Sequence, residues 1–210
     1  MRLQPYSFYF LAALMAWHYQ TPGIPDHLFK RLPGIPLTKR EARLLIISAL
    51  RMEADSVLWD IGAGTGTISV EIALLCPQAQ VIAVERDEEV ADLVRRNCAH
   101  FQTDNITVIE GNAPECFAQI ATKPDRICLG GGKPIKVLLS EAWQCLRQGG
   151  RAVAMATNLE QLYQLSEGFS ELQARNVEVV QAAINRLETQ GMRQVFAAVD
   201  PMFILSGEKI

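Results

Sequence analysis

The feature of this sequence that most constrains its fold is a glycine-rich segment between two apolar runs. Residues 57–60 have the apolar character of a buried β-strand, and Asp60 to Gly66 then read D-I-G-A-G-T-G before the helix-like residues 67–75. Glycine lets the backbone turn sharply and lets a ligand lie against bare main chain. Glu85 follows Gly66 by nineteen residues, at the end of the next apolar run, where a carboxylate can accept hydrogen bonds from ribose hydroxyls. The segment therefore predicts a site for a nucleoside cofactor.

The spacing of the glycines distinguishes between two classes of cofactor. The dinucleotide fingerprint is G-x-G-x-x-G, but here Thr67 occupies the third position and the glycine comes one residue early, at Gly66. The form D-x-G-x-G-x-G resembles the first motif of class I S-adenosylmethionine methyltransferases. We therefore predict methyl transfer rather than dinucleotide chemistry. A tight turn without a ligand is the alternative, because a glycine motif alone is a weak signal.

Composition and charge exclude several other classes of protein. Of the 210 residues 49% are hydrophobic, and a net charge of −3 argues against a protein built mainly to bind nucleic acid. The five cysteines and three histidines lack metal-ligand spacing, so we predict no metal site and free thiols in a reducing cytoplasm. Residues 8–17 are apolar, but they are too short to span a bilayer and no cleavage site follows. We expect an N-terminal helix there, with a signal peptide as the less favoured alternative.

The chain is predicted to divide into an N-terminal helix and arm, residues 1–50, and a methyltransferase domain, residues 51–210. Residues 21–37 contain four prolines, which forbid a regular helix, while the apolar residues between them predict an ordered arm or lid. Thr38, with Glu41 three residues later, matches a capping box that would begin the helix after the arm.

From residue 57 onward, short apolar runs alternate with segments of helical length, which predicts βαβ units and a mostly parallel sheet. The last two runs have no helix between them, only a turn at residues 189–191, so they must pair antiparallel. We predict a Rossmann-like α/β fold with a seven-stranded, mostly parallel sheet and a C-terminal antiparallel hairpin. The predicted strands are 57–60, 81–85, 106–110, 126–130, 151–156, 177–185 and 194–199 with 202–206; the predicted helices are 67–75, 88–100, 114–120, 134–146 and 159–174.

Ligands in an open α/β sheet bind beyond the carboxyl ends of the parallel strands. This rule places residues 60–66, Glu85, Asn112, Ala113 and residues 130–132 on one rim. The main chain at Asn112 and Ala113 suits an adenine edge, with an ordinary turn as the equal alternative. Amino-group methyltransferases often carry Asn/Asp-Pro-Pro-aromatic where this chain has three glycines, which disfavours a nucleobase or amine acceptor.

Basic residues gather in the arm and in the helix that follows it, where Glu41 is the one acid between Lys30 and Arg51. On an acidic chain, such a cluster near the cofactor rim predicts a polycarboxylate or a phosphate-bearing substrate. For any single residue a solvated helix face is the alternative. The cluster consists of Lys30, Arg31, Lys39, Arg40, Arg43 and Arg51, and the candidates to join it from elsewhere in the chain are Lys133, Lys136, Arg186 and Arg193.

Several segments together resemble one known family. T-P-G-I-P-D-H-L-F and P-L-T-K-R-E look like the entry segment of the CbiT-type subunit of precorrin-6Y methyltransferase, and the likeness runs from about Trp17 to the C-terminus. The segments concerned are residues 21–29 and 36–41, together with W-D-I-G-A-G-T-G at 59–66, E-G-N-A-P-E at 110–115 and G-G-G at 130–132.

This resemblance implies an enzyme of cobalamin biosynthesis that methylates carbon-15 of precorrin-6B, or its cobalt form, and decarboxylates the ring-C acetate. It also implies a homotetramer and a separate carbon-5 methylase as partner, without nucleic-acid or membrane partners. The alternatives are a methyltransferase acting on RNA or protein, and a non-catalytic partner that binds S-adenosylmethionine. No residue is predicted as catalytic. The predicted cofactor-binding residues are Thr38, Asp60, Gly62, Ala63, Gly64, Thr65, Gly66, Glu85, Asn112, Ala113 and Gly130.

Overall fold

One sheet, in the order β3-β2-β1-β4-β5-β7-β6, organises residues 17–210, the part of the chain that this computed structural model describes. Strands β1 to β5 pair in parallel, and β7 pairs antiparallel with both β5 and β6. The predicted Rossmann-like fold with a C-terminal hairpin is thereby confirmed. The strands are β1 (Val57–Ile61), β2 (Gln80–Glu85), β3 (Ile106–Glu110), β4 (Arg126–Leu129), β5 (Arg151–Ala156), β6 (Arg175–Gln190) and β7 (Arg193–Glu208).

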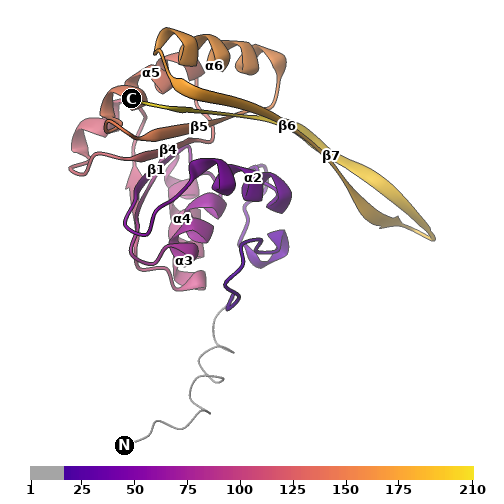
Figure 1. The fold of residues 1–210 in the computed structure, drawn as a ribbon. Coiled ribbons are helices and arrows are strands. Elements are labelled where there is room, and N and C mark those ends of the chain that lie inside the picture. The colour runs from indigo at the N-terminus through magenta and orange to yellow at the C-terminus, as the bar shows by residue number, and fades with distance from the viewer. Residues whose placement is uncertain (1–16) are drawn as a thin grey trace, which may run out of the picture.

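Helices cover both faces of the sheet (Figure 1). Alternation along β1 sends Trp59 and Ile61 into the core beneath α5 and α6, whereas Leu58 packs with α2 and α3. Every residue of β1 is buried, as expected for a central strand covered on both sides. The helices are α2 (Arg40–Leu50), α3 (Thr67–Leu75), α4 (Glu88–Phe101), α5 (Ile135–Cys145) and α6 (Leu159–Glu171), with the 3₁₀ helices η1 (Asp26–Leu28) and η2 (Glu115–Gln119).

The helix expected over residues 8–17 lies outside the described residues, apart from Trp17. The α-helix expected over residues 114–120 is wrong, because η2 is a single short 3₁₀ helix whose Phe117 packs on Trp59. Within residues 17–210, no helix is long and apolar enough to cross a membrane.

The arm before α2 is ordered, as predicted, and it is fastened to the domain by apolar side chains. It contains only η1 as regular structure. Its anchors bury themselves against α3 and α4, so the arm follows the surface of the domain instead of extending from it. The anchors are Ile24, Phe29 and Leu37, which cluster with Val70 and Phe101.

The predicted capping box at Thr38 is wrong. Helix α2 begins at Arg40, its N-cap residue is Lys39, and that side chain makes no capping hydrogen bond. Instead, Oδ1 of Asp26 accepts a hydrogen bond of 2.9 Å from the backbone N–H of Arg40. A carboxylate of the arm therefore satisfies a free N–H at the helix start and lies at the positive end of the helix dipole. Glu41, the other half of the predicted box, turns towards the hairpin.

The C-terminal hairpin is longer than the apolar runs predicted. Strands β6 and β7 each contain 16 residues, and their outer half projects beyond the domain (Figure 1). Pairing continues out to Gln190 and Arg193. Residues 186–190 of β6 are exposed or half-buried, so they lack the apolar run by which the buried strands were predicted.

Candidate active site

A cavity of about 620 Å³ lies at the carboxyl edge of the sheet, within the range usual for small-molecule sites. Its floor is the glycine turn between β1 and α3. One wall is the end of the arm, residues 36–39, and the opposite wall is the hairpin; Gly130 and Gly131 close a third side. The cavity therefore joins four segments that are far apart in the sequence.

The glycine turn requires glycine for conformational and steric reasons. Gly62, Gly64 and Gly66 have φ values of 73°, 56° and 78°, in the left-handed region that other residues adopt at a cost. A Cβ on Gly62 would lie 3.2 Å from the backbone nitrogen of Gly131. The turn and the three-glycine loop after β4 thus pack main chain against main chain.

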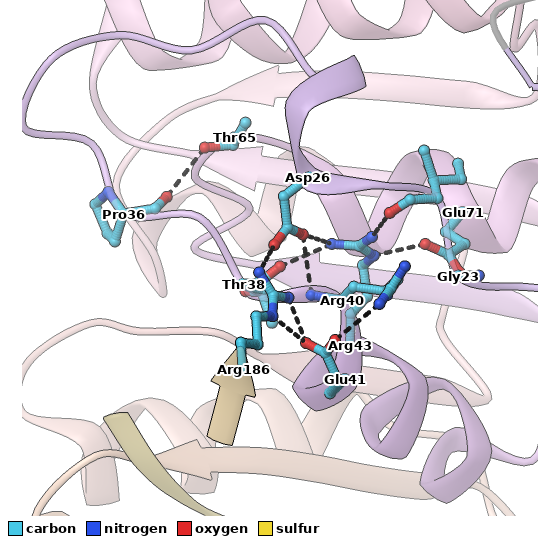
Figure 2. Close-up of polar contacts among 11 residues, drawn as sticks. Gly23, Asp26, Pro36, Thr38, Arg40, Glu41, Arg43, Thr65, Glu71 and Arg186 are labelled. Atoms are coloured by element: carbon cyan, nitrogen blue, oxygen red, sulfur yellow. Dashed lines mark hydrogen bonds and ion pairs between the residues drawn. The ribbon is translucent and has the colours of Figure 1, made fainter. Parts of the chain in front are cut away.

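The arm passes directly over this turn. The carbonyl oxygen of Pro36 accepts a hydrogen bond of 3.0 Å from Oγ1 of Thr65, as Figure 2 shows. The same oxygen lies 3.8 Å from where a Cβ of Gly64 would be. A ligand on the turn would therefore be flanked by the main chain of the arm.

Asp60 is the buried acid of the cavity floor. Its Oδ2 accepts a hydrogen bond of 2.5 Å from Oγ of Ser69, and its Oδ1 has no hydrogen-bond partner among residues 17–210. Burial raises the pKa of Asp60 to about 6; the hydrogen bond from Ser69 opposes the rise and the charge of Glu85 adds to it. A buried carboxylate oxygen without a partner, at the edge of a cavity, fits a cationic group of a ligand.

Glu85 borders the cavity without lining it. Its Oε2 accepts a hydrogen bond of 3.0 Å from the backbone N–H of Gly64, and its Oε1 accepts two, of 2.9 Å from Arg86 and 3.3 Å from Asp87. These bonds fix the carboxylate beside the glycine turn. Each carboxylate oxygen has two lone pairs, so Oε2 can still accept a hydrogen bond from a ligand.

The predicted cofactor residues fall into two groups. The larger group lines the cavity: Thr38, Asp60, Gly62, Ala63, Gly64, Thr65 and Gly130. The remaining four, Gly66, Glu85, Asn112 and Ala113, are not among its lining residues. Gly66 begins α3 as its N-cap residue. Asn112 and Ala113 follow β3, whose last residue, Glu110, pairs in register with Glu85, so they lie on the same rim of the sheet.

Sequence reasoning named Arg186 as a possible addition to the basic cluster, but it missed the other residues of the hairpin wall. No pattern in the chain indicates that residues so far from the glycine turn return to cover it. The missed lining residues are Glu188, Ala198, Val199, Pro201 and Met202 of the hairpin, with Thr157 just before α6 and Gln161 within it.

A buried ion pair holds the arm in place. Nε of Arg43, on α2, donates to Oε2 of Glu71, on α3, at 2.5 Å. The other two guanidinium nitrogens of Arg43 donate to the carbonyl oxygens of Thr38, at 2.7 Å, and of Ile24. Glu71 also accepts the backbone N–H of Gly23 (Figure 2). One fully buried pair therefore binds both ends of the arm.

The basic cluster predicted in this region is not a single surface. Arg43 is buried and neutralised by acids, and Arg51 pairs with Glu178 and Glu208 at 3.1 and 3.0 Å. Of the six basic residues, only Lys39 lines the cavity. Successive helical residues are rotated by about 100°, so residues that cluster in the sequence of α2 point in different directions.

The fold, the glycine turn and the adjacent acids define an S-adenosylmethionine-dependent methyltransferase of the Rossmann-like class. Residues 33–209 match the family model described as the precorrin methyltransferase domain. The chain belongs to this family, it is an enzyme, and its methyl donor is S-adenosylmethionine.

Individual relatives agree with this assignment. A Saccharolobus solfataricus protein described as a probable cobalt-precorrin-6B C(15)-methyltransferase (decarboxylating) is 38% identical over 198 residues, which cover 93% of this chain and 100% of the relative. The precorrin-6Y C5,15-methyltransferase of Geobacter metallireducens is 29% identical with a TM-score of 0.83, covering 90% and 98% of the two chains. The C-terminal domain of the Rhodobacter capsulatus precorrin-6Y C5,15-methyltransferase is 26% identical with a TM-score of 0.80, covering 91% and 100%.

Proposed function

We propose that this chain methylates carbon-15 of precorrin-6B or its cobalt form, in cobalamin biosynthesis, and removes the ring-C acetate carboxylate as CO₂. The name of the S. solfataricus relative describes this activity. The observation that carries the proposal is the cavity, in which a glycine turn and a buried acid on the floor face a hairpin wall that carries Arg186.

The cofactor is proposed to lie along the glycine turn. Residues 62–66 would offer main chain, Glu85 would accept the ribose hydroxyls, and the main chain at Asn112 and Ala113 would meet the adenine edge. Oδ1 of Asp60 would accept the ammonium of the methionyl group, since it is buried and has no partner among residues 17–210. When bound, S-adenosylmethionine supplies a methyl group on a positively charged sulfur.

Positioning supplies most of the catalysis in such a transfer. The arm within residues 1–50 would act as a lid on the domain formed by residues 51–210, with Thr38 at its inner edge and Gly130 opposite. Together with the hairpin, it would exclude water from the reacting carbon. Breaking the bond to the acetate carboxylate leaves an electron pair, which the conjugated macrocycle can accept, and a site with little water favours that step.

The test is a direct assay of the purified protein. We expect incubation with precorrin-6B and isotopically labelled S-adenosylmethionine to add one labelled methyl group to the macrocycle and to release one CO₂, both followed by mass spectrometry. The same protein should leave unmodified tRNA unlabelled. An unchanged corrin together with labelled tRNA would refute the proposal and favour the RNA-methylating alternative.

We further propose that the hairpin joins copies of this chain, in keeping with the expected homotetramer. Strand β6 is an edge of the sheet, and a long edge strand with apolar side chains tends to pair with another chain. Leu187 and Phe196 face each other across the hairpin and are 54% and 74% exposed. Replacing Phe196 with Glu should convert the assembly into monomers in analytical ultracentrifugation. A wild-type monomer would refute this proposal.

Carbon-5 methylation would need a second catalytic unit. The R. capsulatus neighbour is the C-terminal domain of an enzyme named for both carbons. The match to this chain covers all of that domain. We therefore propose a carbon-5 methylase as partner of the unit described by residues 33–209. Pull-down with that methylase tests the contact.

A further inference from the structure

Arg186 is a charged residue that the proposed reaction has not yet used. It lies on β6, in the hairpin wall of the cavity, and its side chain is 31% exposed. Alternation along β6 places Arg186 and Glu188 on the cavity face, and both line the cavity, whereas Leu187 points to the other side.

Two acids hold the Arg186 guanidinium in one orientation. Its Nε and Nη2 donate to Oε2 of Glu41, on α2, and its Nη1 lies 2.9 Å from Oδ2 of Asp26, in the arm (Figure 2). Burial alone would raise the pKa of Glu41, but hydrogen bonds from Arg186 and Arg40 outweigh it and lower this pKa to about 2. The acid that orients Arg186 is therefore ionised at any physiological pH.

Arg186 still has donors for another acceptor. A guanidinium has five N–H groups. Among residues 17–210, Glu41 engages two of the nitrogens and Asp26 engages the third through one contact each. One N–H on each terminal nitrogen is left, and two N–H groups of this kind match the two oxygens of a carboxylate.

The charges around Arg186 balance, so the placement of each charge decides where an anion can bind. Three carboxylates and three guanidiniums cancel in the network of Figure 2, and Lys39, which lines the cavity, adds one positive charge. Glu188 is the opposing charge, and it lies about 6.6 Å farther along the strand. The favourable position for an anion is therefore on the Lys39 side of Arg186. The network consists of Asp26, Glu41 and Glu71 with Arg40, Arg43 and Arg186.

We propose that Arg186, assisted by Lys39, binds a peripheral carboxylate of the corrin substrate and so sets which ring carbon faces the methyl group. This inference rests on the proposed function and assigns the residue that recognises its substrate. The orienting acids come from the arm and α2, so the carboxylate site forms only when the hairpin and the arm are both in place.

The test compares four proteins: wild type, Arg186→Gln, Glu41→Gln and Arg175→Gln. Arg175 is an exposed arginine at the other end of β6 and serves as the matched control. For each protein, we would measure KM for precorrin-6B, the Kd for S-adenosylmethionine by calorimetry, and the thermal unfolding midpoint. We expect Arg186→Gln to raise KM roughly 10- to 100-fold, the scale of a lost charged hydrogen-bond pair, and to leave the cofactor Kd unchanged. Arg175→Gln should match wild type.

Glu41→Gln separates substrate binding from a purely structural role. If Arg186 only fastens the hairpin to the arm, removing either partner should have the same effect on KM and on thermal stability. If Arg186 binds substrate, Glu41→Gln keeps the cation and loses only part of its orientation, so it should raise KM clearly less than Arg186→Gln does. Equal KM increases in the two variants, or an unchanged KM in Arg186→Gln, would overturn the inference.

Two further comparisons keep the test decisive. Arg186→Lys, which keeps the charge, should fall between wild type and Arg186→Gln, and it replaces the latter if that variant does not fold. Methyl-esterified precorrin-6B should abolish the difference between wild type and the variants, and a difference that persists would count against carboxylate binding. A wild-type protein that leaves precorrin-6B unmodified would refute the proposed function itself, whereas an active wild type with an unaffected Arg186→Gln would refute only this inference.

Discussion

Replacing Asp60 with Asn should stabilise the protein without cofactor while weakening the binding of S-adenosylmethionine. Asp60 is 1% exposed, and Oδ1 has no hydrogen-bond partner among residues 17–210. The isolated fold therefore carries a buried charge that is only partly compensated by Ser69. Asn keeps the size of the side chain and an oxygen for that hydrogen bond, but it removes the charge.

The magnitude follows from the pKa of Asp60, which rises from an ordinary 3.8 to about 6. The folded protein binds this proton more tightly than the unfolded chain, so the contribution of Asp60 to stability is most favourable below pH 4 and is lost as the pH rises through 6. One pKa unit corresponds to about 1.4 kcal/mol, which gives a penalty of about 3 kcal/mol at neutral pH. For a chain of this size, that corresponds to a midpoint shift of roughly 6–12 °C.

Thermal unfolding between pH 4 and pH 8, without cofactor, measures this effect. We expect wild type and Asp60→Asn to unfold at similar temperatures at pH 4, and the variant to unfold at the higher temperature at pH 7.5. Calorimetry should show that wild-type cofactor affinity falls below pH 6 and that the variant loses roughly 10- to 100-fold at pH 7.5. A variant that is less stable than wild type at pH 7.5, or one with undiminished cofactor affinity, would refute the reasoning.

Three further substitutions test the floor and the arm of the cavity. Glu85→Ala should weaken cofactor binding by about 1–3 kcal/mol in calorimetry, because it removes a charged acceptor. Gly130→Ala should lower cofactor affinity and the unfolding free energy by about 1–3 kcal/mol, because its Cβ would lie 2.8 Å from the carbonyl oxygen of Gly62. Arg43→Met should reduce the unfolding free energy in urea by about 3–5 kcal/mol, because Glu71 would stay buried without its partner.

Each of these substitutions has a matched control. Glu110→Ala removes an exposed acid next to Glu85 in the sheet register and should leave cofactor affinity intact. Gly131→Ala adds a Cβ that meets no atom within 4 Å, so it should be tolerated where Gly130→Ala is not. Replacing Glu71 together with Arg43 by Met should recover part of the lost stability. If a control behaved like its test variant, the assigned contact would not be the cause.

The sequence predicted the sheet well because its inner strands are covered on both sides. Residues 57–61 lie between two layers of helices and are apolar except for Asp60, so the strand can be recognised from its sequence. Residues 186–190 of β6 are exposed or half-buried, so they carry no such run and were missed. The apolar run at residues 194–199 of β7 was predicted.

The arm also shows where prediction from local sequence fails. Thr38 and Glu41 have the spacing of a capping box, yet Asp26 supplies the carboxylate at the start of α2. Glu41 prefers Arg186, which lies 145 residues away and offers a guanidinium instead of a single backbone N–H. The ion pair of Glu41 with Arg186 therefore replaces the local hydrogen bond that the spacing predicted.

By itself, the sequence determined the cofactor class and the position of its turn. Glycines with positive φ between a strand and a helix, followed by an acid at the next strand end, depend only on local conformation and on chain order. The tertiary structure alone decided which charges face the cavity. Arg43 and Arg186 are both arginines beside the arm, but packing buries one against Glu71 and leaves the other at the cavity wall. That difference depends on which elements cover each side chain, and the linear spacing of residues does not contain it.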